Sequence, residues 1–382
     1  MIRRPSRADP LSAPVFIAGA FGQGNPGDEA LLTAFLRALS DLPVIVASAD
    51  PVDTGRRHGV TAIPSLSWRA VTRALRDSRA VVFAGGTVFK NLPLETGRHR
   101  SALLRNALAI ATMARAAGKP VCMTGVGVGD LDDLAGRALA RALARQADLL
   151  VLRDEESART LGHIGVPVPL RVGADPSWTL FDQVPDDTVE RTETIVVVPS
   201  RWAAGVTPRL VEVLAGSLQP LLSAGYEVQV QPWQTDRSGN DDRRQAAQLA
   251  ERLRGDVSVL PPPRDLADAA ASFGRARLVL ASRLHALVAA GAAGSSFVGI
   301  GHEHKLDAIA NRLGQLAMSP TTTGVAGAAM MQAALSLAPP ARSAIRAEVA
   351  AADEAFALQR LVLSGGEMSA DSVSGLRLEP TW

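Results

Sequence analysis

Two residues that could carry chemistry stand at the end of an apolar run in the second half of the chain. The string "LVLASRLHALVAAGAAG" ends a strand-like segment and places Arg283 and His285 at the start of a helix. An arginine there can hold an anion through two hydrogen bonds, and a histidine can carry a proton near neutral pH. The competing interpretation of His285 is a buried core histidine without a chemical role. Together the two residues predict a cleft that binds an anionic ligand.

Two further basic residues are expected at the same edge. Arg201 in "VVVPSRW" ends the first strand of this half, and Lys305 in "GIGHEHKLDAI" follows the last strand. Because parallel strands present their carboxyl ends at one edge, both side chains can converge on the cleft. His302 and His304 flank Glu303 but lack a further ligand at a known spacing, so no metal site is predicted.

Glycine-rich turns follow three strands in the first half: "GQGNPGDE", "FAGGTVF" and "MTGVGVGD". The first spells G-x-G-x-x-G with Gly22, Gly24 and Gly27. Asp50 ends the next apolar run, where a ribose-binding carboxylate would stand in a dinucleotide fold. The spelling alone therefore allows a nicotinamide-binding site.

The start of the helix after the first turn argues against a dinucleotide. Asp28 and Glu29 lie in its first turn, where they would repel a pyrophosphate, and Pro26 removes a backbone donor. These carboxylates either serve only the helix dipole or bind neutral hydroxyls such as those of a sugar. On the second interpretation, the residues predicted to bind such hydroxyl groups are Asn25, Asp28, Glu29, Gly85 and Gly86.

The elements that must position these residues alternate regularly along the chain. Short apolar runs predict strands in the first half at 15–18, 44–48, 80–84, 121–124, 149–152 and 170–172. A second series is predicted at 195–199, 226–231, 257–260, 278–281 and 297–300, and Ala/Leu/Arg-rich helical segments separate the strands. The fold class is therefore α/β, with two Rossmann-like doubly wound domains that face a cleft.

Breaks in this alternation set the expected domain boundaries. We expect a disordered start over residues 1–13 and an N-terminal domain, which carries the predicted hydroxyl-binding residues, over 14–176. A linker is expected over 177–194, where prolines and acids interrupt the pattern. The C-terminal domain, which carries the predicted anion-binding residues and His285, is expected over 195–363. Its last helix, near 340–363, is expected to pack back across the domains. Residues 364–382 are expected to form a flexible tail.

Composition excludes several classes of protein. Forty lysines and arginines stand against 38 acidic residues, with no block of like charge, so nucleic-acid binding is not expected. Only Lys90, Lys119 and Lys305 are lysines, and Cys122 is the single cysteine, which leaves no disulfide or cysteine metal site. No apolar run approaches the length of a membrane span, and no signal peptide is evident. A cytoplasmic location is expected.

The order of these motifs resembles the polysaccharide pyruvyltransferase family. The resemblance runs from "GNPGDEALL" through "FAGGTVF", "GVGVG", "VLRDEESARTLGHIGV" and "VGADPSW" to "SRLHALVAAGAAG" and "GIGHEHKL". It implies the B-type glycosyltransferase fold and transfer of the pyruvyl group of phosphoenolpyruvate onto two sugar hydroxyls as a cyclic ketal. It also implies that Arg283 and His285 are the catalytic pair. Arg201 and Lys305 would contact the donor, phosphoenolpyruvate, on the C-terminal domain. The N-terminal domain would be the acceptor side, so its hydroxyl-binding residues would be the acceptor-binding residues.

The resemblance implies no cofactor, because phosphoenolpyruvate serves as a co-substrate. A lipid-linked saccharide acceptor would bring the protein into peripheral contact with the inner face of the membrane. Three alternatives stay open on the sequence: a B-type glycosyltransferase that uses a nucleotide sugar, a nicotinamide-dependent oxidoreductase, and a binding protein without catalysis. The acceptor sugar and the oligomeric state are also open.

Overall fold

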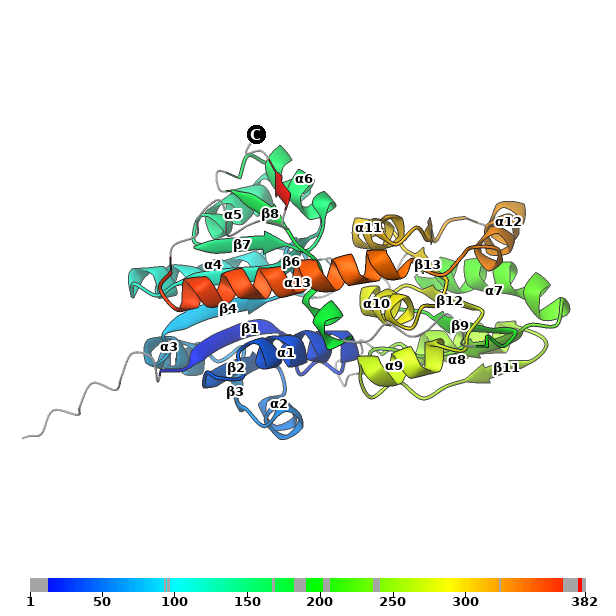
Figure 1. Cartoon of the computed structure of the whole chain (residues 1–382), viewed down its shortest axis with the longest axis horizontal. Helices are drawn as coiled ribbons and strands as arrows, with labels where there is room; N and C mark the ends of the chain where they lie inside the picture. Colours follow the sequence, from blue (N-terminus) through cyan, green and yellow to red (C-terminus); the bar gives the residue numbers. More distant parts are fainter. Residues whose placement is uncertain are drawn as a thin grey trace, which may run out of the picture.

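Two open sheets lie end to end in the molecule, each flanked by helices (Figure 1). The computed structural model describes residues 13–92, 94, 97–166, 169–181, 190–201, 207–235, 241–322, 324–366 and 377–379. The parallel strands and flanking helices confirm the predicted α/β class with two Rossmann-like domains.

The N-terminal sheet has nine strands in the order β15-β8-β7-β6-β4-β1-β2-β3, with β5 paired to β6. Its strands are β1 (Val15–Phe21), β2 (Val44–Ser48), β3 (Thr61–Pro64), β4 (Ala80–Ala84), β5 (Thr87–Phe89), β6 (Val121–Val128), β7 (Leu149–Leu152), β8 (Leu170–Val172) and β15 (Arg377–Glu379). All pairs are parallel except β15 with β8. The carboxyl ends of the parallel strands therefore share one edge.

Alternation along β1 explains how this sheet buries both faces. Phe16 packs with helices α3, α4, α5 and α6 on one face, and Ile17 packs with α1 and α13 on the other. Helices of this domain are α1 (Pro26–Ala38), α2 (Pro51–His58), α3 (Trp68–Asp77), α4 (Ala102–Ala116), α5 (Leu134–Ala144), α6 (Glu155–His163) and the short 3₁₀ helix η3 (Pro176–Leu180).

The C-terminal sheet is entirely parallel in the order β11-β10-β9-β12-β13-β14. Its strands are β9 (Thr194–Val198), β10 (Glu227–Val230), β11 (Val257–Val259), β12 (Leu278–Ala281), β13 (Phe297–Ile300) and β14 (Leu316–Met318). Its helices are α7 (Thr207–Ser223), α8 (Arg243–Arg252), α9 (Leu266–Phe273), α10 (Leu284–Ala292), α11 (His304–Arg312) and α12 (Gly324–Leu335). Every residue of α10 is buried, which suits its apolar sequence "LHALVAAGA".

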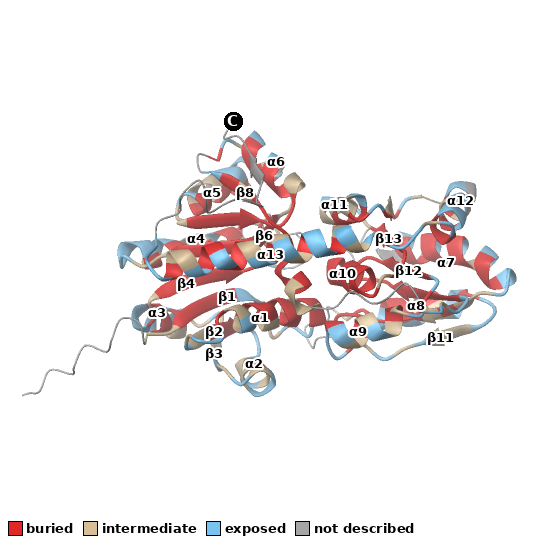
Figure 2. Ribbon diagram, in the orientation of Figure 1, coloured by how far each residue is buried: buried red, intermediate tan, exposed pale blue. Residues whose placement is uncertain are grey.

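Helix α13 (Arg342–Leu363) lies across both domains in Figure 1. Its first half gives Ile345 and Ala352 to the core around α10, and its second half gives Phe356 and Leu363 to the core beneath β1. The ring of Phe356 meets that of Phe35 edge to face, with centroids 4.9 Å apart. Figure 2 shows the matching stripe of buried residues along the helix, above sheets whose central strands are buried.

Four short strands, β3, β5, β14 and β15, are absent from the sequence-based prediction. β3 reads "TAIP" and has no buried residue, so it lacks the apolar run on which the other predictions rest. β15 lies within the predicted tail, where residues 377–379 pair with β8. The start at 1–12, linker residues 182–189 and most of the tail fall outside the described residues.

None of the helices in the described ranges is long and apolar enough to cross a bilayer.

Candidate functional site

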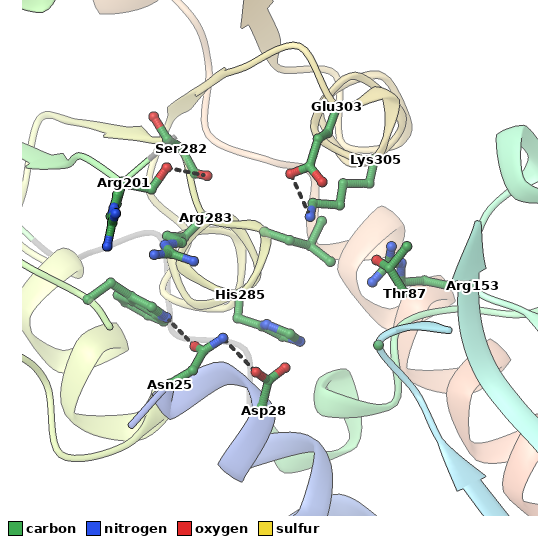
Figure 3. Close-up of a pocket in the computed structure, with 14 residues that line it drawn as sticks. Asn25, Asp28, Thr87, Arg153, Arg201, Ser282, Arg283, His285, Glu303 and Lys305 are labelled. Carbon is green, nitrogen blue, oxygen red and sulfur yellow. Dashed lines mark hydrogen bonds and ion pairs between the residues drawn. The ribbon is translucent and has the colours of Figure 1, made fainter. Parts of the chain in front are cut away.

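A cavity of about 160 Å³ opens between the two domains, at the carboxyl ends of both sheets (Figure 3). Its N-terminal wall comes from the turns after β1, β4 and β7, and its C-terminal wall from the turns after β9, β10, β12 and β13. It is lined by Asn25, Asp28, Gly86, Thr87, Arg153, Ser200, Arg201, Trp233, Ser282, Arg283, Leu284, His285, Glu303 and Lys305. The four candidate residues of the C-terminal half therefore line one cavity, as their positions at the carboxyl ends of parallel strands predict (the strand-end rule below). They are Arg201, Arg283, His285 and Lys305.

His285 lies in the first turn of α10, and its side chain is 9% exposed. Its Nε2 atom is 3.5 Å from Oδ2 of Asp175, a residue that follows β8 in the other domain. The second oxygen of Asp175 accepts hydrogen bonds from the backbone N–H and the hydroxyl of Ser177. A carboxylate and an imidazole thus face each other across the domain interface, which suits a histidine that must hold or release a proton.

Asp175 stays ionised in this setting. Burial acts to raise the pKa of its carboxyl group, but His285, Arg153 and Ser177 together lower that pKa well below its usual range.

Asp28 lies on the opposite side of His285 from the basic residues, on the first turn of α1 (Figure 3). Burial raises the pKa of its carboxyl group, although His285 and the hydrogen bond from Asn25 oppose the rise. Its Oδ2 atom accepts a hydrogen bond of 2.7 Å from the Asn25 side chain. Asn25 caps α1 and also accepts from the indole N–H of Trp233, so it links the two domains. This wall presents amide and carboxyl groups that can hydrogen-bond to hydroxyl groups.

Two of the predicted acceptor residues lie outside the cavity lining. Glu29 points under the glycine-rich turn, where its carboxylate accepts from the Gly22 N–H and contacts Nε2 of His58 at 2.8 Å. Gly85 packs against Leu31, whereas its neighbour Gly86 lines the cavity. Of the five predicted residues, the structure brings Asn25, Asp28 and Gly86 together.

The dinucleotide spelling has a structural explanation in the same turn. Glu29 already occupies the Gly22 N–H with a negative charge, and Asp50 caps α2 through the N–H of Asp53. A pyrophosphate at this turn would meet the Glu29 and Asp28 carboxylates.

Gly27 carries no side chain because His285 lies against it. A Cβ atom at Gly27 would lie 2.2 Å from Nδ1 of His285 and 2.6 Å from its Cβ, far inside contact distance. We expect Gly27→Ala to displace the imidazole and to lower turnover at least tenfold, because a shift of about 1 Å at a reacting group can cost 10²-fold. Turnover per folded molecule, measured beside the melting temperature, checks this.

Gly216→Ala is the matched control for that substitution. Gly216 is also helical, but open space surrounds the position that its Cβ would take. Wild-type turnover in the Gly27→Ala protein would show that the close approach to His285 is incidental.

Arg283 is engaged by a buried carboxylate. Its Nε and Nη2 atoms donate to Asp242 at 3.0 Å and 2.7 Å, and Asp242 is 0% exposed. Asp242 also accepts from the backbone N–H groups of Arg201 and Gln234. One carboxylate therefore fixes the strand-end turns after β9 and β10 together with the Arg283 guanidinium.

A second group of charges, made by Lys305, Glu303 and Arg153, lines the cavity away from Arg201 and Arg283 (Figure 3). Nζ of Lys305 is 2.7 Å from Oε2 of Glu303. Burial acts to raise the pKa of Glu303, but Lys305 and Lys90 outweigh it and hold this pKa at about 2. Burial lowers the pKa of Lys305, with Glu303 opposing the change. The Arg153 side chain is only 6% exposed, and its Nη2 atom has no hydrogen-bond partner within the described ranges.

Sequence reasoning missed Arg153, Asp175 and Asp242 as site residues. Arg153 and Asp175 stand just after β7 and β8, so the rule that located Arg283 could also have located them. Asp242 gives no such signal, because it precedes α8 and reaches the site only through the fold. Within the described residues, no cluster of histidine, cysteine or carboxylate side chains could hold a metal ion.

The overall fold is that of B-type glycosyltransferases and nucleotide-sugar epimerases. A putative UDP-N-acetylglucosamine 2-epimerase from Listeria monocytogenes superposes with a TM-score of 0.61 at 9% identity, covering 94% of this chain and 99% of that one. The UDP co-structure of MnaA from S. aureus gives 0.62 at 11% identity, over 92% and 97% of the two chains. The UDP complex of HepE from Anabaena gives 0.59 at 13% identity, over 92% and 100%. At these identities the likeness defines the fold alone.

The family follows from the sequence. The family model of polysaccharide pyruvyl transferase matches residues 25–304, which include the cavity-lining residues from Asn25 to Glu303. The chain belongs to the polysaccharide pyruvyl transferase family. A comparison with curated protein sequences found no match.

Proposed function

We propose that this protein transfers the pyruvyl group of phosphoenolpyruvate onto two hydroxyls of a sugar in a polysaccharide or its precursor, with release of phosphate. The observation that carries the proposal is the arrangement around His285. Arg201, Arg283 and Lys305 line the cavity from the C-terminal domain, and Asn25 and Asp28 lie on the other side of His285 (Figure 3). A small dianionic donor and a hydroxyl-rich acceptor would occupy these two sides.

The reaction needs a proton carrier and anion-binding groups. In the first step, C3 of phosphoenolpyruvate takes a proton from the His285 imidazolium while one acceptor hydroxyl oxygen bonds to C2. The hydroxyl proton returns to His285. In the second step, the other hydroxyl oxygen bonds to C2 as the bond from C2 to the phosphate oxygen breaks. Phosphate leaves with the electron pair and takes the proton of that second hydroxyl. Asp175, which stays negatively charged, lies beside the ring while it gives up and regains its proton.

The basic residues supply positioning and electrostatic stabilisation. Arg201 and Lys305 are the proposed contacts to the donor carboxylate and phosphate, and the Arg153 guanidinium, which also lines the cavity, is a third positive group. Because the transfer changes no oxidation state, the proposed reaction uses phosphoenolpyruvate as a co-substrate and no redox cofactor. A cytoplasmic enzyme would meet phosphoenolpyruvate directly, and a lipid-linked acceptor would bring it to the inner face of the membrane.

Incubation with phosphoenolpyruvate and a panel of lipid-linked or nucleotide-linked sugars tests the proposal. The expected result is stoichiometric phosphate release and a product heavier by one pyruvate less one water. The second candidate is a glycosyltransferase that uses a nucleotide sugar, which the UDP bound to a protein of the same fold favours. Retention of UDP, with no phosphate released from phosphoenolpyruvate, would decide for that candidate.

Donor binding should depend on Arg201 and Lys305. Arg201→Gln or Lys305→Met should weaken phosphoenolpyruvate binding about ten- to hundredfold, because a hydrogen bond to a charged group contributes about 1.5–3 kcal/mol. Acceptor binding should change much less. Calorimetric titration with each substrate measures both effects. The control is Lys119→Met, since Lys119 binds the Leu75 and Arg76 carbonyls away from the cavity. Unchanged donor affinity in both variants would remove these residues from the donor site.

A further inference from the structure

Helix α11 connects the cavity to the domain interface through its two ends. Lys305 lies in its first turn and lines the cavity, whereas Arg312 is its last residue and contacts the other domain. The position of Lys305 relative to the N-terminal domain therefore depends on what Arg312 holds.

Arg312 binds the main chain of the two turns that carry Arg153 and Asp175. Its Nη1 atom donates to the carbonyl of Arg153 at 3.0 Å, and its Nη2 atom donates to the carbonyl of Gly173 at 3.2 Å. Gly173 lies two residues before Asp175, the partner of His285. One guanidinium thus ties α11 to the turns after β7 and β8 at once.

A third element holds Arg312 in place. Glu348 of α13 accepts from Nε of Arg312 at 2.7 Å, and the side chain of Glu348 is 8% exposed. Burial raises the pKa of Glu348 to about 7, and the charges of Glu155 and Asp175 add to the rise. The positive charge of Arg312 opposes this rise in the pKa of Glu348, and so favours the ionised carboxylate.

We propose that Arg312, held by Glu348, is a positioning residue that sets the donor side of the cavity by fixing Arg153 and Asp175 against Lys305 and His285. Arg312 does not line the cavity, so it acts through these residues and not on the substrate. The spread of donors over a planar fork is essential, because one group must reach two carbonyls and a carboxylate. The kinetic part of this proposal rests on the proposed function.

Arg312→Lys tests the proposal, because it keeps the charge but cannot make the three contacts together. We expect kcat/KM for phosphoenolpyruvate to fall about 10- to 10²-fold, with the acceptor KM unchanged, because small displacements of reacting groups are costly. Glu348→Gln keeps an oxygen that can accept from Nε, so it should lose much less activity than Arg312→Lys.

Arg191→Lys is the matched control. Arg191 also donates to several carbonyls, those of Gly274, Ala276 and Gly294, but all of these belong to the C-terminal domain. The two lysine variants should show similar losses of melting temperature, and only Arg312→Lys should lose kcat/KM. Equal kinetics in the two variants would overturn the proposal.

Hydrogen exchange separates this proposal from the proposed function. The Ser177 amide donates to Asp175 and reports on the turn that Arg312 holds. In the absence of any substrate, this amide should exchange faster in Arg312→Lys than in Arg191→Lys and wild type. Unchanged exchange would refute the positioning role. Failure of the wild-type protein to release phosphate would instead refute the proposed function and leave the exchange result to decide on Arg312.

Discussion

Replacement of His285 by alanine should lower turnover about 10²- to 10⁴-fold while the protein stays folded, which is the usual contribution of a general acid or base. The imidazole lies between the Asp175 carboxylate and the side of the cavity formed by Asn25 and Asp28, and no other histidine of the described ranges lines the cavity. Phosphate release and thermal unfolding, measured on the same preparations, separate the loss of chemistry from the loss of fold.

His163→Ala is the control for this substitution, because His163 lies on an exposed position at the end of α6. The competing interpretation of His285 as a core histidine predicts the reverse pattern, with a lowered melting temperature and near-normal activity per folded molecule. Normal phosphate release from a well-folded His285→Ala protein would end the mechanism proposed above.

Arg283→Ala should cost about 3–5 kcal/mol of folding free energy, because it leaves the Asp242 carboxylate buried without its cationic partner. Asp242 is 0% exposed, and among the described residues it would keep two backbone N–H donors, from Arg201 and Gln234. Denaturant unfolding measures the loss. Arg283→Lys should be inactive, because an ammonium group cannot reproduce the two-point contact that orders the strand-end turns.

The surface pair of Arg264 and Asp268 provides the matched control. It joins the same residue types at 2.8 Å, but the Arg264 side chain is 85% exposed, so Arg264→Ala should cost much less folding free energy than Arg283→Ala. Adding Asp242→Asn to Arg283→Ala should recover part of the stability, because it removes the uncompensated charge. Equal losses for Arg283→Ala and Arg264→Ala would show that the buried pair has no special weight.

The sequence predicts most of the fold because the strands are buried on both faces. Continuous apolar runs such as "AVVFA" and "LLVL" mark β4 and β7 with their observed bounds. β3 and β14 escape such reasoning, because a strand at a sheet edge is short and partly exposed. Pairing of β15 with β8 is set by tertiary contact and leaves no local signal in the sequence.

Site residues that come directly after a strand can be predicted from the sequence, whereas the others cannot. The strand-end rule brings Arg201, Arg283, His285 and Lys305 to one cavity. It cannot distinguish Asp28, which faces the cavity, from Glu29, which turns under the loop toward His58. Adjacent helical residues differ by about 100° in direction, so the helix orientation decides between them. The Arg283–Asp242 pair joins residues far apart in sequence, and only the fold shows it.

Helix α13 has a consequence for how the chain folds during synthesis. Phe356, Leu358 and Leu363 complete the core beneath β1, a strand made more than three hundred residues earlier. Domains commonly fold in order from the N-terminus as they leave the ribosome. Phe35 of α1 packs against Phe356 in the folded protein, so it lacks this partner until α13 has been made. A chain that stops before residue 342 would therefore lack part of both cores.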